Sequence, residues 1–162
     1  MTAEKKKQMG VLGLIIALVV VLFGGVLFVG AVSGWFDGQK VTLDAEYYGA
    51  GGELVDLTAT EYGELVQARK SFVVFVDQGG CTTADRLRQF VTDYATEKGF
   101  KVYRMMFSEV KQSSLHVQVK YYPSEAILSK GSVCGALQAD SDADAPAYND
   151  YAAFQEWIRR YL

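Results

Sequence analysis

The sequence is poor in the residues on which metal sites and disulfide frameworks depend. Among 162 residues there are only two cysteines, Cys81 and Cys134, and one histidine, His116. Two cysteines cannot build a disulfide-stapled scaffold or a cysteine zinc site, and one histidine excludes any site that needs two. No P-loop, nucleophile-elbow or dinucleotide-binding glycine pattern occurs. We therefore predict neither a bound metal nor a cofactor.

Charged residues are missing altogether from residues 8–36, and the rest of the chain has no basic excess. From Asp37 onward there are 13 Lys and Arg against 18 Asp and Glu, an acidic excess of five. This mildly acidic balance argues against a nucleic-acid partner. The whole chain is 50% hydrophobic and 22% charged, which excludes a disordered or fibrous protein. The residues after the uncharged stretch are enough for one domain with its own core.

Residues 10–32 form an unbroken apolar run of 23 residues. A helix of ~20 residues crosses the ~30 Å hydrocarbon layer, so the run predicts one transmembrane helix and the lipid bilayer as a partner. Lys5, Lys6 and Lys7 precede it, and the positive-inside rule then places residues 1–9 in the cytoplasm and the domain outside. A cleaved signal peptide is the alternative, but this run exceeds the usual signal core of ~7–15 residues. We expect a single-pass cell-membrane protein with an extracytoplasmic domain.

After a polar linker at residues 33–52, residues 53–162 alternate between strand and helix patterns. We predict strands at residues 53–57, 71–76, 101–107, 126–129 and 133–137. We predict three helices: one capped by Thr58 or Thr60, one opened by a Thr82–Asp85 capping box, and one capped by Asn149 or Asp150. Residues 115–122 fit a helix and a strand equally. The order predicts an α/β domain, a mixed sheet with helices on both faces.

Two stretches of this domain resemble the thioredoxin fold. The residues SFVVFVDQGGC, at 71–81, resemble the family's central strand leading to its active-site cysteine. Tyr122-Pro123 followed by SEAILSKGSV resembles the family's cis-proline, strand, turn and next strand, and the last helix closes the chain as in the family. The resemblance covers about residues 54–162. It implies a thioredoxin-like sheet, a nucleophilic Cys81 at a helix start, and a cis-Pro123 beside which Tyr122 and Thr82 contact an extended substrate.

The active-site motif departs from the family at three positions. The usual C-x-x-C is here Cys81-Thr82-Thr83-Ala84, so the resolving cysteine is replaced by Ala84. Gly80 stands where the family has tryptophan, and Phe75 stands at the family's buried acid. Two-cysteine thioredoxin chemistry is therefore not available to this chain alone.

Cys81 is still placed to react, because backbone N–H groups at a helix N-terminus favour the thiolate. We expect Arg86 and Arg88 to add to this effect, and Asp77 and Asp85 to oppose it.

Two functions follow. The first is single-cysteine thiol–disulfide exchange with protein thiols through Cys81. The second is a non-catalytic module that binds extended peptides along the Tyr122–Pro123 edge. We expect Cys134 to be a small buried hydrophobe that does not pair with Cys81.

Overall fold

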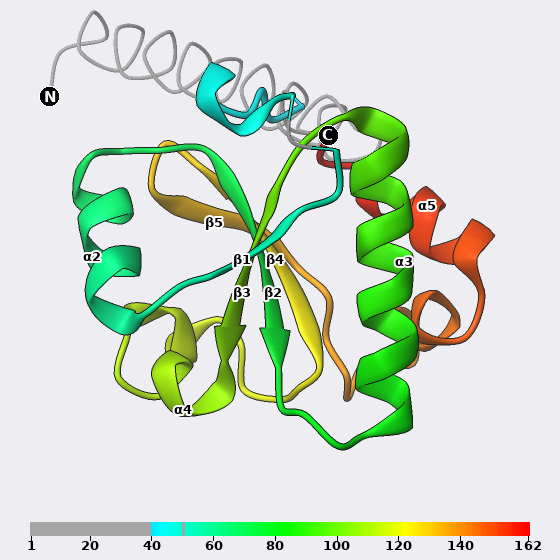
Figure 1. Ribbon diagram of the computed structural model, residues 1–162. Coiled ribbons are helices and arrows are strands. Elements are labelled where there is room, and N and C mark those ends of the chain that lie inside the picture. Colours follow the sequence, from blue (N-terminus) through cyan, green and yellow to red (C-terminus); the bar gives the residue numbers. More distant parts are fainter. Residues whose placement is uncertain (1–39, 50) are drawn as a thin grey trace, which may run out of the picture. The chain divides into compact units, whose positions relative to one another are not determined.

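The computed structural model describes residues 40–49 and 51–162 and contains a five-stranded sheet of order β1-β3-β2-β4-β5 (Figure 1). The strands are β1 (Leu54–Asp56), β2 (Phe72–Asp77), β3 (Val102–Met106), β4 (Ser124–Ser129) and β5 (Ser132–Ala136). The α-helices are α2 (Ala59–Gln67), α3 (Thr82–Lys98), α4 (Phe107–Val110) and α5 (Tyr151–Ile158). Short 3₁₀ helices are η1 (Ala45–Tyr47), η2 (Ser114–Val117) and η3 (Ala145–Tyr148).

The sheet is mixed, as predicted from the order of the elements. Strands β1, β3 and β2 run parallel, whereas β4 is antiparallel to β2 and β5 is antiparallel to β4. Helices α2 and α4 cover one face, and α3 and α5 cover the other (Figure 1). The chain therefore has a thioredoxin-like arrangement of a central sheet between two helical layers.

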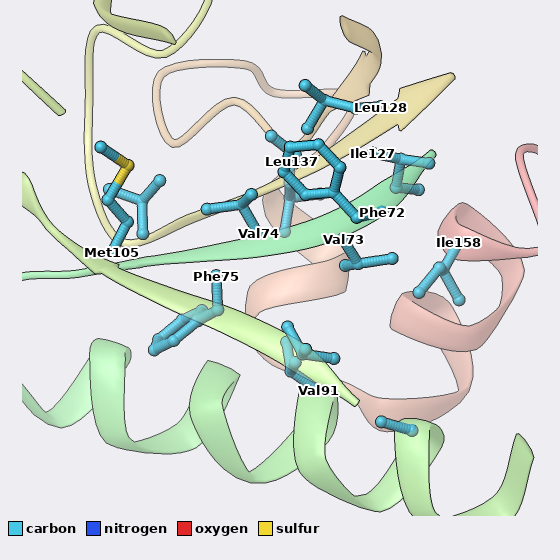
Figure 2. Packing of buried hydrophobic residues seen from close by; sticks show 14 of the residues in the cluster. Phe72, Val73, Val74, Phe75, Val91, Met105, Ile127, Leu128, Leu137 and Ile158 are labelled. Carbon is cyan, nitrogen blue, oxygen red and sulfur yellow. The ribbon is translucent and has the colours of Figure 1, made fainter. Parts of the chain in front are cut away.

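Strand β2 lies at the centre of the hydrophobic core, and all six of its residues are buried. Its side chains alternate between the two faces, as the two-residue period of a strand requires. Val73 and Phe75 point toward α3 and α5, whereas Phe72 and Val74 point to the opposite side (Figure 2). An unbroken apolar run suits a strand that is covered on both faces.

Two of the predicted helix starts are confirmed. Thr58 caps α2 in a reciprocal capping box with Glu61, and the Asp150 carboxylate accepts from the Ala153 N–H at the start of α5. The capping box predicted for Thr82 and Asp85 is wrong. Helix α3 begins one residue earlier than that box requires, with Cys81 as its N-cap, and Arg88 engages the Asp85 carboxylate instead.

The sequence of residues 115–122, before the cis-proline, fits a helix and a strand equally, but the segment forms neither. It forms the 3₁₀ turn η2 and then runs irregularly into β4. Helix α4, which has four residues, was not predicted because so short a helix has no repeat to recognise.

Part of the expected linker packs against the domain. The compact unit begins at Lys40, the Val41 N–H donates to the carbonyl of Tyr161, and Leu43 and Tyr47 are buried. Within residues 40–49 and 51–162 no helix has both the length and the apolar character needed to cross a bilayer. The anchor predicted at residues 10–32 lies outside the described residues.

Candidate functional site

Cys81 lies at the carboxyl end of the central strand, where the chain turns from β2 into α3. Strand β2 ends at Asp77, three turn residues follow, and Cys81 is the N-cap of α3. Gly79 and Gly80 have φ angles of 73° and 68°. Residues with a Cβ pay a steric penalty there, so the turn that presents Cys81 favours glycine at position 80 over the tryptophan of the family.

The start of its own helix favours the thiolate form of Cys81. The backbone N–H groups of Ala84 and Thr83, and to a lesser degree the Thr83 hydroxyl, lower the pKa of the Cys81 thiol, whereas burial and the Asp85 charge oppose this shift. The sulfur itself forms no capping hydrogen bond with the described residues. The residue is partly exposed and its thiol is free. A thiolate at a helix N-terminus that solvent can reach is the form of cysteine that attacks disulfides.

The arginines expected to help the thiolate are used elsewhere. Arg88 bonds Asp77 at 3.0 Å and Asp85 at 2.8 Å, and its guanidinium lies 6.0 Å from the centre of the Phe75 ring. Arg86 donates to Asn149 Oδ1 at 2.8 Å. Our expectation that both arginines stabilise the thiolate is therefore wrong, because the backbone N–H groups of the helix start lower the thiol pKa and neither arginine contributes.

The peptide bond between Tyr122 and Pro123 is cis, as the resemblance implied. Val76 pairs with Ser124 in the β2–β4 ladder, so Pro123 lies beside Asp77, four residues before Cys81. The Tyr148 hydroxyl donates to the Pro123 carbonyl at 2.9 Å and is also 3.2 Å from the carbonyl of Leu137. The fold therefore brings the proline loop to the end of the strand that leads to the cysteine.

Tyr122 lines a separate open cavity of about 520 Å³. Its ring lies 3.8 Å from that of Phe107, centre to centre. The remaining lining residues are Lys111, Lys120, Tyr121, Ala139 and Asp140. In the described part of the chain, no hydrogen bond occupies the backbone N–H or C=O of Tyr122. Cys81 and Thr82 are not part of this cavity, and Thr82 is exposed at the first position of α3.

Glu125 is a residue that the sequence analysis missed. Its side chain is completely buried in β4, opposite Phe75 of β2, and neither carboxyl oxygen has a partner within the described residues. Burial raises the pKa of Glu125 to about 8, so the carboxyl group is mostly protonated at neutral pH. Its charge, when present, would raise the pKa values of Tyr94 and Tyr148, which places the carboxyl near α3 and η3. Glu125 directly precedes the apolar residues 126–128 and lies outside the strand predicted at residues 126–129, so no local pattern indicated its burial.

Cys134 is exposed, so the expectation that it is a buried hydrophobe is wrong. It lies on β5, an edge strand that has a neighbouring strand on one side only. Its thiol donates to the Ile127 carbonyl at 3.2 Å. This partial burial of the sulfur raises the pKa of the Cys134 thiol.

Both cysteines are free, in agreement with the prediction that they do not pair. Cys134 lies level with the start of β2 and Cys81 follows its end, which separates them by roughly 13 Å along the strand alone. This exceeds the ~7 Å Cα limit for a disulfide. Among residues 40–49 and 51–162 no cluster of three or more His, Cys, Asp or Glu side chains is arranged to hold a metal ion.

Comparisons with known proteins identify the fold. No family model matches the chain, and no curated protein matches it in sequence. Thioredoxin f of spinach chloroplast is 15% identical with a TM-score of 0.52, and the match covers 75% of this chain and 96% of that one. Thioredoxin of Schistosoma mansoni is 13% identical with a TM-score of 0.50, and the match covers 68% of this chain and 99% of that one. Thioredoxin O1 of Arabidopsis thaliana is 9% identical with a TM-score of 0.50, and the match covers 67% of this chain and 97% of that one. Residues from about 54 to 162 thus form a domain with the thioredoxin fold.

Proposed function

We propose that this chain is a membrane-anchored protein whose extracytoplasmic thioredoxin-fold domain performs thiol–disulfide exchange with a single cysteine, Cys81. The observation that supports it is the place of Cys81, which is the N-cap of α3 with a free and partly exposed thiol. The backbone N–H groups of Ala84 and Thr83 at this helix start lower the pKa of the thiol. The apolar run at residues 10–32 and the three lysines before it support the anchor and its orientation.

The chemistry needs a second thiol from outside. The Cys81 thiolate attacks one sulfur of a partner disulfide, the Cys81–partner bond forms, and the other partner sulfur leaves as a thiolate that takes a proton from solvent. An external thiolate then attacks the mixed disulfide, forms a new disulfide with the partner and releases Cys81 as the thiolate. Cys81 ends in the oxidation state in which it began, and Ala84 plays no part as a nucleophile.

The second candidate is a peptide-binding module without chemistry. The unoccupied backbone groups of Tyr122, next to a cavity walled by Phe107 and Tyr121, suit an extended peptide that adds to the edge beside Pro123. Lys111 and Lys120 line the same cavity, so this reading favours peptides with acidic side chains.

The deciding experiment measures how fast Cys81 is alkylated by iodoacetamide as a function of pH. The exposed second thiol must be removed first, so the measurement uses the full chain with Cys134→Ser. We expect the Cys81 pKa to lie below that of an ordinary thiol, ~8.5. An ordinary or higher value would leave the thiol without its activation and would favour the binding module.

Partner capture separates the two functions further. In the first, Cys81→Ser abolishes mixed disulfides with partner proteins, whereas Cys134→Ser, the matched control, leaves them intact. In the second, partners bind Cys81→Ser as well as the natural chain and are lost on Lys120→Glu. Binding that survives Cys81→Ser with no mixed disulfide detected in the natural chain would reject the exchange function.

A further inference from the structure

The structure contains a second cavity at the opposite end of the domain from Cys81. It has a volume of about 430 Å³ and lies by Lys98, the last residue of α3, whereas Cys81 precedes the first residue of that helix. Helix α3 has 17 residues, so the two places are roughly 25 Å apart. This cavity is therefore not part of the thiol site.

Three basic side chains from three separate segments line the cavity. Lys40 comes from the first described residues, Lys98 from the end of α3 and Arg159 from the end of α5. No Asp or Glu side chain is among the described residues that line it.

Among the described residues, these cations have no acidic partner. Within residues 40–49 and 51–162, none of the three forms a salt bridge. The Lys98 Nζ lies 5.7 Å from the centre of the Tyr94 ring, and the Arg159 guanidinium donates to the Gln155 amide oxygen at 3.4 Å. Three positive charges that lack an acidic partner in the described part of the chain favour an anion as the occupant of the cavity.

The rest of the lining is apolar, which points to an anion with a hydrocarbon part. Leu43 and Phe100 are buried core residues that contribute to the wall, and the ring of Tyr48 is exposed beside them. A free phosphate would leave this apolar surface in water, whereas a phospholipid would cover it with its glycerol and acyl ends.

The chain itself keeps this cavity near the predicted bilayer. Lys40 follows Val32, the end of the apolar run, by eight residues. Eight residues span at most ~28 Å when fully extended. If residues 10–32 cross the membrane, Lys40 therefore stays within that distance of the membrane surface, while Cys81 lies at the other end of α3.

We propose that the cavity formed by Lys40, Lys98 and Arg159 binds the headgroup of an anionic phospholipid of the membrane in which the chain is anchored. The lipid phosphate sits among the three cations, and the glycerol backbone lies against Leu43 and Phe100. The site orients the domain with Cys81 directed away from the bilayer. This inference rests on the proposed membrane anchor but not on the chemistry of Cys81.

The test measures lysine acetylation in the full chain, reconstituted in lipid nanodiscs of phosphatidylcholine with or without phosphatidylglycerol. A brief treatment with an uncharged acetylating reagent is followed by peptide mass spectrometry. We expect phosphatidylglycerol to slow acetylation of Lys40 and Lys98 by roughly fivefold. Lys130 is the internal reference, because it lies outside the cavity, in the β4–β5 turn next to Ser71 at the same end of the sheet.

Variants distinguish a built site from general attraction to a charged surface. Arg159→Gln should remove the protection of Lys40 and Lys98, whereas Arg160→Gln, one residue along and outside the cavity, should preserve it. Equal protection of Lys130, or protection unaffected by Arg159→Gln, would overturn the proposal.

Two further arms identify the source of the phosphate and separate this proposal from the anchor. Inorganic phosphate added to phosphatidylcholine nanodiscs should give no protection, and protection equal to that by phosphatidylglycerol would overturn the lipid assignment. Short-chain phosphatidylglycerol added to the detergent-solubilised chain should protect both lysines even if the chain fails to insert into nanodiscs. Failed insertion with protection in detergent rejects the anchor alone, and no protection in detergent rejects the lipid site.

Discussion

Glu125 lies directly opposite Phe75 in the antiparallel pair of β2 and β4, and its fully buried carboxyl group has no partner within the described residues. Directly opposed residues in such a pair point to the same face of the sheet, so the acid shares the side covered by α3. The resemblance to the thioredoxin family implied an acid at the position that Phe75 occupies. Here the two strands have an aromatic ring and an acid in facing positions.

The buried Glu125 carboxyl group makes the free energy of unfolding depend on pH. The unfolded chain loses the Glu125 proton near pH 4.5, whereas the folded chain keeps it to about pH 8. Between these values the folded state binds more protons, so the free energy of unfolding falls as the pH rises, by at most ~1.4 kcal/mol per pH unit. Urea unfolding of the full chain in mild detergent at pH 5, 7 and 9, values chosen to bracket ~8, should show the decline.

Glu125→Leu should remove this contribution to the slope, because the substituted side chain does not titrate. Glu64→Leu, at an exposed position of α2, is the control and should leave the slope unchanged. Natural and Glu125→Leu chains with the same slope would show that Glu125 reaches water in the folded state.

The Cys81 pKa should move in opposite directions in two neighbouring variants. Thr83→Val removes a hydroxyl that lowers the thiol pKa and should therefore raise it, whereas Asp85→Asn removes an opposing charge and should lower it. Alkylation rates against pH, measured with Cys134→Ser, report both shifts. Thr82→Val is the control, since Thr82 is exposed and should leave the pKa unaltered. Shifts of the same sign in both variants would contradict the described contacts.

Restoring the second cysteine should restore a disulfide. Ala84→Cys places a thiol at i+3 from Cys81, in the first turn of the helix that Cys81 caps. The variant should lose the mass of two hydrogens on oxidation and should reduce insulin in the presence of dithiothreitol. We expect the activity to be modest, because Phe75 offers no proton relay. Ala84→Ser is the matched control, and a variant that retains two free thiols under oxidant would sink this expectation.

Glycine at position 80 should be needed for its backbone angle. Gly80→Ala has open space for a Cβ but a φ of 68°, so we expect a loss of about 1 kcal/mol in the free energy of unfolding. Gly63→Ala also meets nothing within 4 Å, yet it lies inside helix α2 and should stabilise the chain by ~0.5–1 kcal/mol. Equal effects of the two substitutions would show that the turn adopts another conformation.

The orientation of the domain can be measured with a membrane-impermeant maleimide on whole cells. The exposed Cys134 of the natural chain should be labelled without lysis, and so should Asp142→Cys in the Cys134→Ser background. The Cys134→Ser chain alone gives the background from Cys81. Labelling of these positions only after lysis would place the domain in the cytoplasm.

The sequence predicted those parts of the fold that depend on neighbouring residues. The buried strand β2 and the long helix α3 follow from hydrophobic runs and periods, and Thr58 with Glu61 is a local capping signal. The sequence pattern did not predict contacts between residues that are far apart in the chain. The Arg88 guanidinium bonds Asp77, eleven residues earlier, as well as Asp85, and no local pattern indicates the longer contact.

The candidate site was predicted only in outline for the same reason. Cys81 and Pro123 follow from their motifs, but the helix starts one residue earlier than the capping pattern indicates. Thr83, rather than Thr82, therefore has the hydroxyl that lowers the Cys81 pKa. The exposure of Cys134 depends on β5 being an edge strand, which no local pattern shows. Glu125 lies outside the strand predicted at residues 126–129, so its burial was not visible.

The ion pair between Arg88 and Asp77 joins the last residue of β2 to the second turn of α3 and closes a short ring of chain around Cys81. The Asp77 carboxylate also accepts the Gly79 N–H at 3.0 Å, which pins the turn from inside. A ring tied at both points restricts hinge motion of the cysteine. In the proposed thiol exchange, movement of the incoming molecule, more than of this chain, should therefore limit how fast the two sulfurs align.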